Sequence, residues 1–169
     1  MLDLIILYVI INRDLTMYSI QKNIRSNFGV FTNPSFGAIR PALTRLEKKG
    51  YIKSAKIMSE GGKLSVFYSI TKEGLKGLTD LLLQHFSSNP IQFIPEAKIK
   101  LSCASFLGND ERLNMFSIIK EAALLHKVTA ENIMKNEYNP LDFYQKMILD
   151  NTMCEYKNLI SLIDGLEKA

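Results

Sequence analysis

Residues 33–50 constrain the fold more than any other part of this 169-residue sequence. Asn33 is of a type that favours the N-cap of a helix, Pro34 suits the first turn, and Gly50 suits the position after the last turn. Between them, apolar residues recur at intervals of three and four, at Phe36, Ile39, Leu43 and Leu46. This spacing predicts a helix that begins at Asn33 and Pro34 and buries these four side chains.

The polar and small residues of the same helix are predicted to form its outer face. This face contains an arginine, a lysine and mostly small side chains, namely Pro34, Gly37, Ala38, Pro41, Thr44, Arg45 and Lys48. Its basic residues are either an ordinary solvated face or contacts to an anionic partner. For Ser35, a hydrogen bond within the first helical turn is an equal alternative.

Two helices are predicted before this one. Residues 2–11 are nearly all apolar, and Thr16 favours the N-cap of a second helix that runs to about residue 28. The second helix has an apolar stripe at Tyr18, Ile20, Ile24 and Phe28. The Tyr18 hydroxyl is placed either to reach a phosphate or to pack between helices.

Residues 51–70 change to a strand pattern. Two runs rich in β-branched and aromatic residues, 51–59 and 64–70, are separated by Glu60, Gly61, Gly62 and Lys63. A Gly-Gly pair between such runs predicts a hairpin. Thr71 then suits the N-cap of a helix that ends near residues 87–90, where the sequence Ser-Ser-Asn-Pro predicts a domain boundary.

Only helical periodicity follows this boundary. We expect helices at about 95–107, from 109 or 110 to 136, and from 140 to about 167. The longer two suit packing between chains. Their methionine and aromatic residues are predicted to form a dimer core, with an effector pocket as the alternative, at Met115, Phe116, Met134, Phe143, Tyr144, Met147, Met153 and Tyr156.

Charge is distributed unevenly along the chain. Residues 1–86 contain 12 Lys and Arg against 6 Asp and Glu, a net charge of +6, whereas the remainder has 9 against 11, a net charge of −2. A positively charged half favours an anionic partner, of which nucleic acid is the most common.

Other classes of protein are disfavoured. The longest apolar run covers residues 4–11, whereas a transmembrane helix needs about 20 residues, so we expect a cytoplasmic protein with no membrane partner. Cys103 and Cys154 are expected to be reduced and buried, and His85 and His126 have no partner at metal-ligand spacing. No catalytic arrangement is recognisable, so an enzyme, a metal site and a cofactor are not expected.

Three helices, a hairpin and a further helix are the order of a winged helix-turn-helix, in which the third helix enters the major groove. Three strings sharpen this interpretation, Pro-Ser-Phe-Gly from Pro34, Pro-Ala-Leu-Thr-Arg-Leu-Glu from Pro41 and Tyr-Ser-Ile-Thr-Lys-Glu-Gly from Tyr68. In these strings the first 86 or so residues resemble the PadR family of bacterial transcription regulators, and the C-terminal half resembles its longer members more loosely. The resemblance implies a homodimer that binds a pseudo-palindromic operator, usually as a repressor.

The sequence also departs from the family. Arg40 precedes Pro41 where the family usually has tyrosine, and this arginine offers an added phosphate or guanine contact. Lys63 is the only basic residue beside the wing glycines, so fewer wing contacts are expected than in the family. The chain has no tryptophan, which many longer members carry in the last helix, and the ligand pocket of such members is therefore not implied.

We therefore predict a mainly α protein with a small β-hairpin wing, built from a winged helix-turn-helix domain at residues 1–88 and a C-terminal α-helical dimerisation region at residues 89–169. DNA contacts are predicted for Tyr18, Ser35, Ala38, Arg40, Thr44, Arg45, Lys48 and Lys63. The predicted partners are double-stranded DNA, a second copy of the chain and an unidentified small-molecule effector. The alternative is a dimeric interaction module that uses a winged helix without binding DNA.

Overall fold

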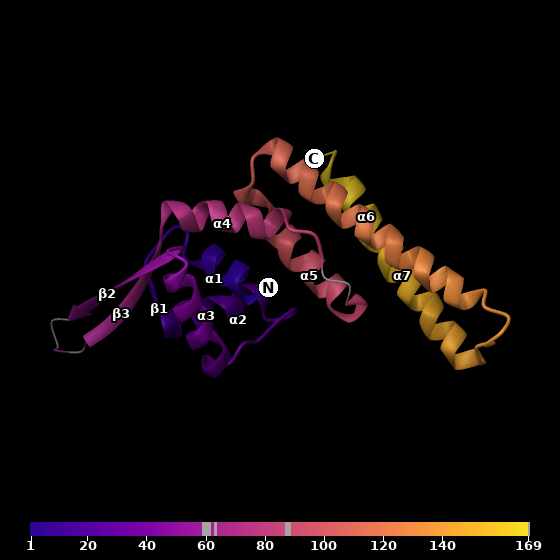
Figure 1. Cartoon of the computed structure of the whole chain (residues 1–169), viewed down its shortest axis with the longest axis horizontal. Helices are drawn as coiled ribbons and strands as arrows, with labels where there is room; N and C mark the ends of the chain where they lie inside the picture. Colours follow the sequence, from indigo (N-terminus) through magenta and orange to yellow (C-terminus); the bar gives the residue numbers. More distant parts are fainter. Residues whose placement is uncertain (59–61, 63, 87–88, 169) are drawn as a thin grey trace. The chain divides into compact units, whose positions relative to one another are not determined.

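The computed structural model describes residues 1–58, 62, 64–86 and 89–168 (Figure 1). Its contacts divide the chain into two compact units. We call residues 1–84 with 98–103 the N-terminal unit, and residues 85–97 with 104–169 the C-terminal unit. The predicted boundary at residues 87–90 falls partly outside the described residues, and the dimerisation role of residues 89–169 stays a prediction.

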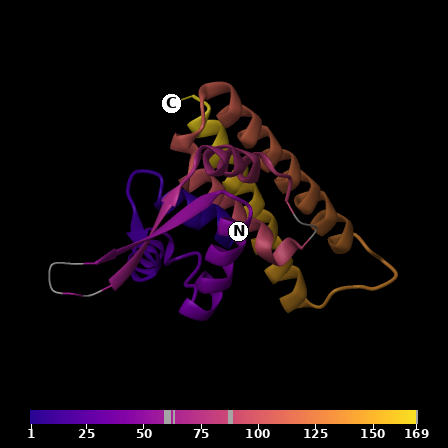
Figure 2. The same ribbon diagram turned by 60° about the vertical axis from the view of Figure 1, so that its left-hand side comes forward.

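The architecture is mainly helical with one small antiparallel sheet, as predicted. The N-terminal unit contains α1 (Leu2–Val9), β1 (Leu15–Thr16), α2 (Met17–Phe28), α3 (Phe36–Lys48), β2 (Ile52–Met58), β3 (Leu64–Ile70) and α4 (Lys72–Leu83). Figure 2 shows the β2–β3 hairpin extending away from the three helices that precede it. This order of helices and hairpin confirms the winged helix.

The core of the N-terminal unit is built from the apolar stripes of its helices. Helix α1 contacts α2, α3 and α4, and α2 also contacts α3. The side chains that these helices bury are Leu4, Ile5, Ile6, Leu7, Ile20, Ile24, Phe28, Ile39, Leu43, Leu46, Leu78 and Leu82. Because each fully buried side chain of this size contributes about 1.5–3 kcal/mol, the stripes fix how each helix is rotated about its axis.

The predicted start of α3 is wrong. The helix begins at Phe36 with Ser35 as its N-cap, rather than at Asn33 and Pro34. The Pro34 carbonyl accepts a hydrogen bond from Gln21 Nε2 at 3.2 Å. This contact holds the segment before α3 against α2, so the chain enters the helix later than the local sequence indicates.

The burial predicted for Phe36 is also wrong, and of the two alternatives left open for Tyr18 the exposed one is found. Phe36 is 40% exposed and Tyr18 is 67% exposed. Each lies in the first turn of its helix, and their rings stack with centroids 6.4 Å apart. The other residues of both stripes are buried as predicted.

The small sheet contains one strand that the sequence did not predict. Strands β2 and β3 pair in antiparallel register, with Ile52 opposite Ile70. The short β1 pairs with the other edge of β3 through Leu15 and Thr16. The predicted turn at residues 60–63 lies outside the described residues except for Gly62, which has a φ of +76°.

Gly50 and Thr71 join the end of α3 to the start of α4. Gly50 has a φ of +72°, a conformation that favours glycine, as expected of the residue after a helix. The Thr71 hydroxyl donates to the Gly50 carbonyl at 2.6 Å and accepts from the Gly74 backbone N–H at 3.0 Å. Thr71 is therefore the N-cap of α4, as predicted.

Helix α4 is shorter than predicted, because it ends at Leu83 rather than near residues 87–90. Gln84 is extended, with φ −63° and ψ 136°. Its carbonyl accepts a hydrogen bond from the ammonium group of Lys100, a side chain that is almost completely buried. This bond gives a buried charge a partner at the C-terminal end of α4, where a cation is favoured.

Most of the C-terminal unit is helical. Helix α5 (Pro90–Ser102) has its first turns in this unit and its end in the other, and it is followed by the 3-10 helix η1 (Ala104–Phe106). The long helices α6 (Asn109–Met134) and α7 (Phe143–Leu166) lie side by side, as both ribbon views show (Figures 1 and 2). They bury Met115, Phe116, Ile119, Ala123, Ala130, Tyr156, Leu159 and Ile163.

Two of the predicted starts in this unit are wrong. Helix α5 begins at Pro90 and contains Pro95, which was the expected first residue. Helix α7 begins after Asp142, whose carboxylate accepts a hydrogen bond from the Gln145 backbone N–H at 2.8 Å. The reciprocal bond from the Asp142 N–H to the Gln145 side chain, at 2.9 Å, completes a capping box and explains why the helix does not begin at Pro140.

Both cysteines are free thiols. Cys103 is buried as predicted, and burial raises the pKa of its thiol to about 12. Cys154 is exposed on α7, so its predicted burial is wrong.

The contact between α4 and the start of β2 predicts an unequal response to two glycine substitutions. A methyl group at Gly74 would lie 2.0 Å from the Tyr51 carbonyl oxygen, whereas one at Gly37 meets only the Ser35 hydroxyl, at 3.6 Å. We expect Gly74→Ala to lower the free energy of unfolding by about 1–3 kcal/mol because of this overlap. The control, Gly37→Ala, is expected to raise it by up to about 1 kcal/mol. Urea unfolding followed by circular dichroism measures both, and equal effects would contradict the packing described.

Candidate nucleic-acid interface

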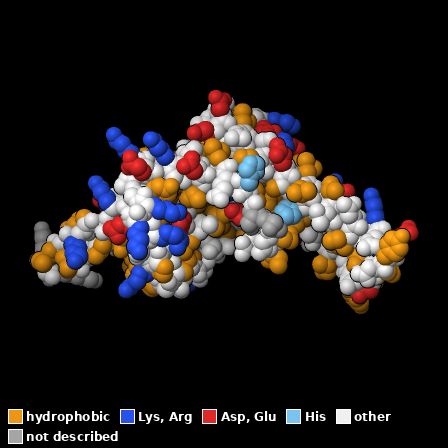
Figure 3. All heavy atoms as spheres, in the orientation of Figure 1, with side chains coloured by type: hydrophobic (Ala, Val, Ile, Leu, Met, Phe, Trp, Pro, Cys, Tyr) orange, Lys and Arg blue, Asp and Glu red, His pale blue; other side chains and the backbone are white. Residues whose placement is uncertain are grey.

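The outer face of α3 carries a shallow depression that brings together four of the predicted contact residues. It has a volume of about 590 Å³ and is lined by Arg40, Pro41, Thr44, Arg45, Lys48 and Lys49. All six residues are exposed. In the space-filling view, Lys and Arg side chains gather on the same unit (Figure 3). The prediction that basic side chains are exposed on the outer face of this helix is therefore confirmed. Their contact with DNA stays a prediction.

A second depression connects α3 to the wing. It has a volume of about 580 Å³ and is lined by Thr16, Met17, Tyr18, Arg40, Ser65, Val66 and Tyr68. Arg40 lines both depressions, so its side chain lies where α3, the first turn of α2 and strand β3 meet. Arg40 is thus central to the surface.

Tyr18 and Phe36 form an exposed aromatic pair beside the second depression. Their rings are nearly parallel, with an interplanar angle of 21°. The stacking holds the Tyr18 ring at the surface, where its hydroxyl is free to meet a polar partner such as a phosphate. Phe36 therefore supports Tyr18 instead of joining the core.

Arg45 is held by a residue that sequence reasoning did not connect with it. Its Nε donates to Asp3 Oδ2 at 3.0 Å, and its Nη2 donates to Asp3 Oδ1. The hydrogen bond and the charge of Asp3 raise the pKa of the Arg45 guanidinium above its usual value. Half of the Arg45 side chain remains exposed.

The two hydroxyl groups predicted to contact DNA have different surroundings. The Thr44 hydroxyl donates to the Arg40 carbonyl, one helical turn earlier, at 3.2 Å. Ser35 is the N-cap residue of α3 and is exposed, and its side chain makes no capping hydrogen bond. Ser35 therefore has the more available hydroxyl of the two, and the intrahelical alternative applies to Thr44 instead.

The remaining predicted contacts are Ala38, Lys48 and Lys63. Ala38 and Lys48 are exposed on α3. Lys63 lies outside the described residues. Ser35 and Ala38 do not line either depression, so the structure groups Arg40, Thr44, Arg45 and Lys48 on one surface and Tyr18 with Arg40 on the other.

Several basic residues near this surface were missed by sequence reasoning. Lys49 lines the depression on α3, with its Nζ 5.8 Å from the centre of the Tyr51 ring. Lys53 and Lys56 are exposed on β2, so the wing has lysines on its first strand in addition to Lys63 after the glycines. Arg13 and Lys22 line another depression beside α2. A count of basic residues in the predicted strand 51–59 would have found Lys53 and Lys56, but the places of the others depend on tertiary packing.

The exposed basic side chains of α3 and the wing suit the binding of a polyanion. A winged helix places α3 in the major groove of DNA while neighbouring elements contact the phosphate backbone. Arginine and lysine bind phosphates, and the guanidinium group also reads guanine. Among the described residues, no group of three or more His, Cys, Asp or Glu could hold a metal ion. No described helix is both long and apolar enough to span a membrane.

Residues 6–80 match the transcriptional regulator PadR-like family. Residues 6–80 of the chain belong to this family. The match runs from α1 to α4 and includes the complete surface described above. This PadR-like protein is thus a transcription regulator with a DNA-binding winged helix. No protein of curated function matches the sequence.

Three solved structures are similar to this PadR-like chain. A transcriptional regulator from Clostridium thermocellum is 38% identical over 46% of this chain and 75% of its own, with a TM-score of 0.42. PadR from Bacillus subtilis in complex with operator DNA is 20% identical over 99% and 97%, with a TM-score of 0.47. The virulence activator AphA from Vibrio cholerae is 21% identical over 99% and 96%, with a TM-score of 0.42. With TM-scores below 0.5, the family assignment depends on the sequence match.

The position of Arg40 predicts a large effect of its removal on DNA binding. We expect Arg40→Ala to weaken binding to DNA by about 1–3 kcal/mol. The reason is that the variant loses the one charged side chain that lines both depressions. Lys76→Ala is the matched control, since it removes the same charge from α4 outside both depressions. Fluorescence anisotropy with labelled duplex DNA measures both affinities. Equal losses would mean that only net charge matters at this position.

Proposed function

We propose that the protein is a homodimeric repressor that binds a pseudo-palindromic operator through α3 and the wing of each subunit. The observation that carries this proposal is the convergence of Arg40, Arg45 and Lys48 on the outer face of α3, beside the β-hairpin. A winged helix with a basic α3 is built to enter the major groove. The repressor role comes from the resemblance to the PadR family.

The side chains that contact DNA are proposed to divide into two groups. Those at the start and middle of α3, Ser35, Ala38 and Arg40, lie where base edges are read in helix-turn-helix proteins. Lys48, near the end of α3, and Tyr18, at the start of α2, are placed for phosphates. Lys63 remains a proposed wing contact on its position in the sequence.

Exposed apolar residues on the long C-terminal helices support the homodimer. Helix α6 exposes Leu113, Leu124, Leu125, Val128 and Ile133, and α7 exposes Phe143, Tyr144, Met147, Ile148, Leu162 and Leu166. If these side chains form one continuous apolar surface, that surface is of the kind that marks an interface. Two copies related by a twofold axis would present two α3 helices to successive major grooves, about 34 Å apart.

Six of the eight aromatic and methionine residues named for this region separate into two sets, and Met134 and Met153 are half-buried. Met115, Phe116 and Tyr156 are buried inside the unit, and the Tyr156 ring lies 5.7 Å from that of His126. Burial lowers the pKa of His126, so this side chain is favoured in its neutral form. Phe143, Tyr144 and Met147 are exposed instead, which favours the dimer interface over the effector pocket for these three.

A second candidate function is a dimeric interaction module that does not bind DNA. The hydrogen bonds of Arg45 with Asp3, which reduce the effective positive charge of α3, favour this alternative. Selection of DNA distinguishes the two functions, because the interaction module would recover no duplex.

Selection from random-sequence duplex DNA tests the proposed function. We expect a recovered sequence with two inverted half-sites whose centres are about 10 base pairs, or a multiple of this, apart. Affinity for it should fall steeply with salt, with a slope of about −0.9 per phosphate contacted in a plot of log affinity against log salt concentration. Failure to recover any sequence, together with a flat salt response, would contradict DNA recognition.

The exposed start of α7 predicts that a charge there separates the subunits. We expect Tyr144→Glu combined with Ile148→Glu to give monomers, because burying two carboxylates in an apolar interface is unfavourable. Tyr138→Glu is the matched control, since Tyr138 is fully exposed between α6 and α7. Size-exclusion chromatography with light scattering measures the mass. A double variant that keeps the mass of a dimer would exclude this face as the interface.

A further inference from the structure

The carboxylate of Asp3, on α1, binds the guanidinium group of Arg45 on the outer face of α3. Asp3 accepts two hydrogen bonds from Arg45, one from Nε and one from Nη2. The Asp3 side chain is 17% exposed, so it is largely enclosed, whereas Arg45 is 50% exposed. The pair therefore fixes the inner edge of the guanidinium group and leaves its outer edge at the surface.

The geometry of the guanidinium group decides which N–H donors of Arg45 remain available when it is paired with Asp3. An arginine has five N–H donors arranged in a planar fork. Asp3 takes the edge formed by Nε and Nη2, so the edge formed by Nη1 and Nη2 retains two parallel donors. That edge is sufficient for a bidentate contact to a phosphate or to guanine. Because the other edge is fixed, the free edge has a defined direction.

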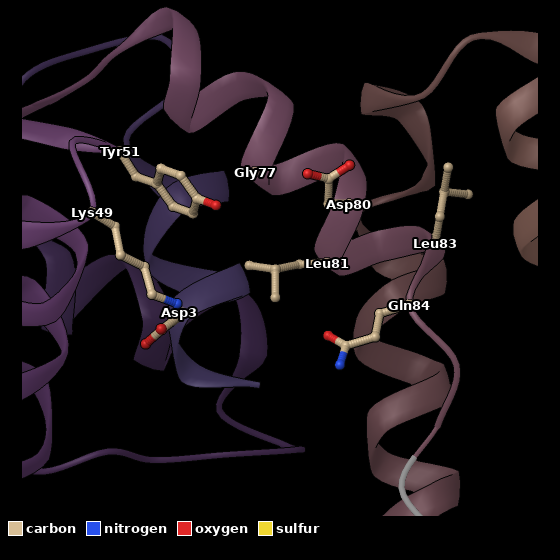
Figure 4. Close-up of a pocket in the computed structure, with 8 residues that line it drawn as sticks. All are labelled: Asp3, Lys49, Tyr51, Gly77, Asp80, Leu81, Leu83 and Gln84. Carbon is tan, nitrogen blue, oxygen red and sulfur yellow. The ribbon is translucent and has the colours of Figure 1, made fainter.

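The charge of Asp3 also reduces the contribution of Arg45 to the general electrostatic attraction between the protein and DNA. A carboxylate in direct contact cancels most of the positive field of the guanidinium at the distance of a DNA duplex. Asp3 also lines a depression with Lys49 and Asp80, shown in Figure 4, so the cluster around it contains charges of both signs. Arg45 is thus an oriented donor within an ion pair whose net charge is close to zero.

We propose that Asp3 is a positioning residue that makes Arg45 contribute to selection among DNA sequences rather than to general attraction for DNA. Asp3 itself does not touch DNA and acts through Arg45 alone. An oriented donor fits only a duplex whose acceptors lie in the matching place, while a free, charged arginine finds a phosphate on any duplex. This inference rests on the proposed DNA binding.

The experiment compares binding to two duplexes, the sequence recovered by selection and a scrambled one of equal length. Asp3→Asn removes the charge and one of the two strong acceptors. We expect it to bind the scrambled duplex about threefold more tightly, with a salt slope steeper by about 0.9 per subunit, because one more cation is free to meet a phosphate. The ratio of the two affinities is expected to fall about tenfold.

Asp80→Asn is the matched control. It removes the same charge from α4, from a residue that lines the same depression as Asp3 (Figure 4). We expect it to leave the ratio of affinities unchanged. If Asp80→Asn lowers the ratio as much as Asp3→Asn does, net charge is the cause and the positioning role is wrong.

Arg45→Lys gives an independent test that does not depend on how well Asp3→Asn folds. A lysine keeps the charge but lacks the planar fork, so it is expected to lower the ratio while retaining affinity for the scrambled duplex. In the Arg45→Lys background, Asp3→Asn should have no further effect on the ratio. An added loss would show that Asp3 acts through another group.

The outcomes separate this inference from the function on which it rests. Wild-type protein that selects no sequence contradicts the proposed function itself. Wild-type protein that discriminates, together with an Asp3→Asn variant that discriminates equally well, contradicts only the role of Asp3.

Discussion

The burial of Ile39, Leu43 and Leu46 determines how α3 can meet a partner. These three side chains are almost completely enclosed, in a unit where α3 contacts both α1 and α2. A change of one residue in the helical register would rotate the helix by about 100° and bring charged side chains into the core. The packing therefore holds Arg40 and Lys48 at the surface, and the remaining features of the interface depend on this orientation.

Local signals in the sequence were sufficient to predict those features that depend only on residues close together in the chain. Thr16 and Thr71 begin α2 and α4 because their hydroxyls reach backbone N–H groups only three residues away, and such spacing is visible in the sequence. Gly50 follows α3 for a similar reason, since the positive φ there is a property of one residue. Periodicity likewise identified the inner face of α3 at Ile39, Leu43 and Leu46, although not at Phe36.

Other features depend on residues that are distant in the sequence, so no local pattern could show them. The start of α3 is delayed by Gln21, which lies 13 residues before its partner Pro34. Asp3 meets Arg45 across 42 residues. The two-residue strand β1 is too short to show any alternation. The basic residues on the outer face of α3 were thus predictable in part, whereas the partner of each basic side chain was not.

Thr16 gives the base of the wing a mechanical role. It pairs with Phe67 of β3 through the backbone, and its hydroxyl caps the first turn of α2 by accepting from the Ser19 N–H. One residue thus clamps the hairpin to the helix that carries Tyr18. A shift of β3 relative to the helices would therefore have to break the pairing of Thr16 or carry the N-cap of α2 along with it.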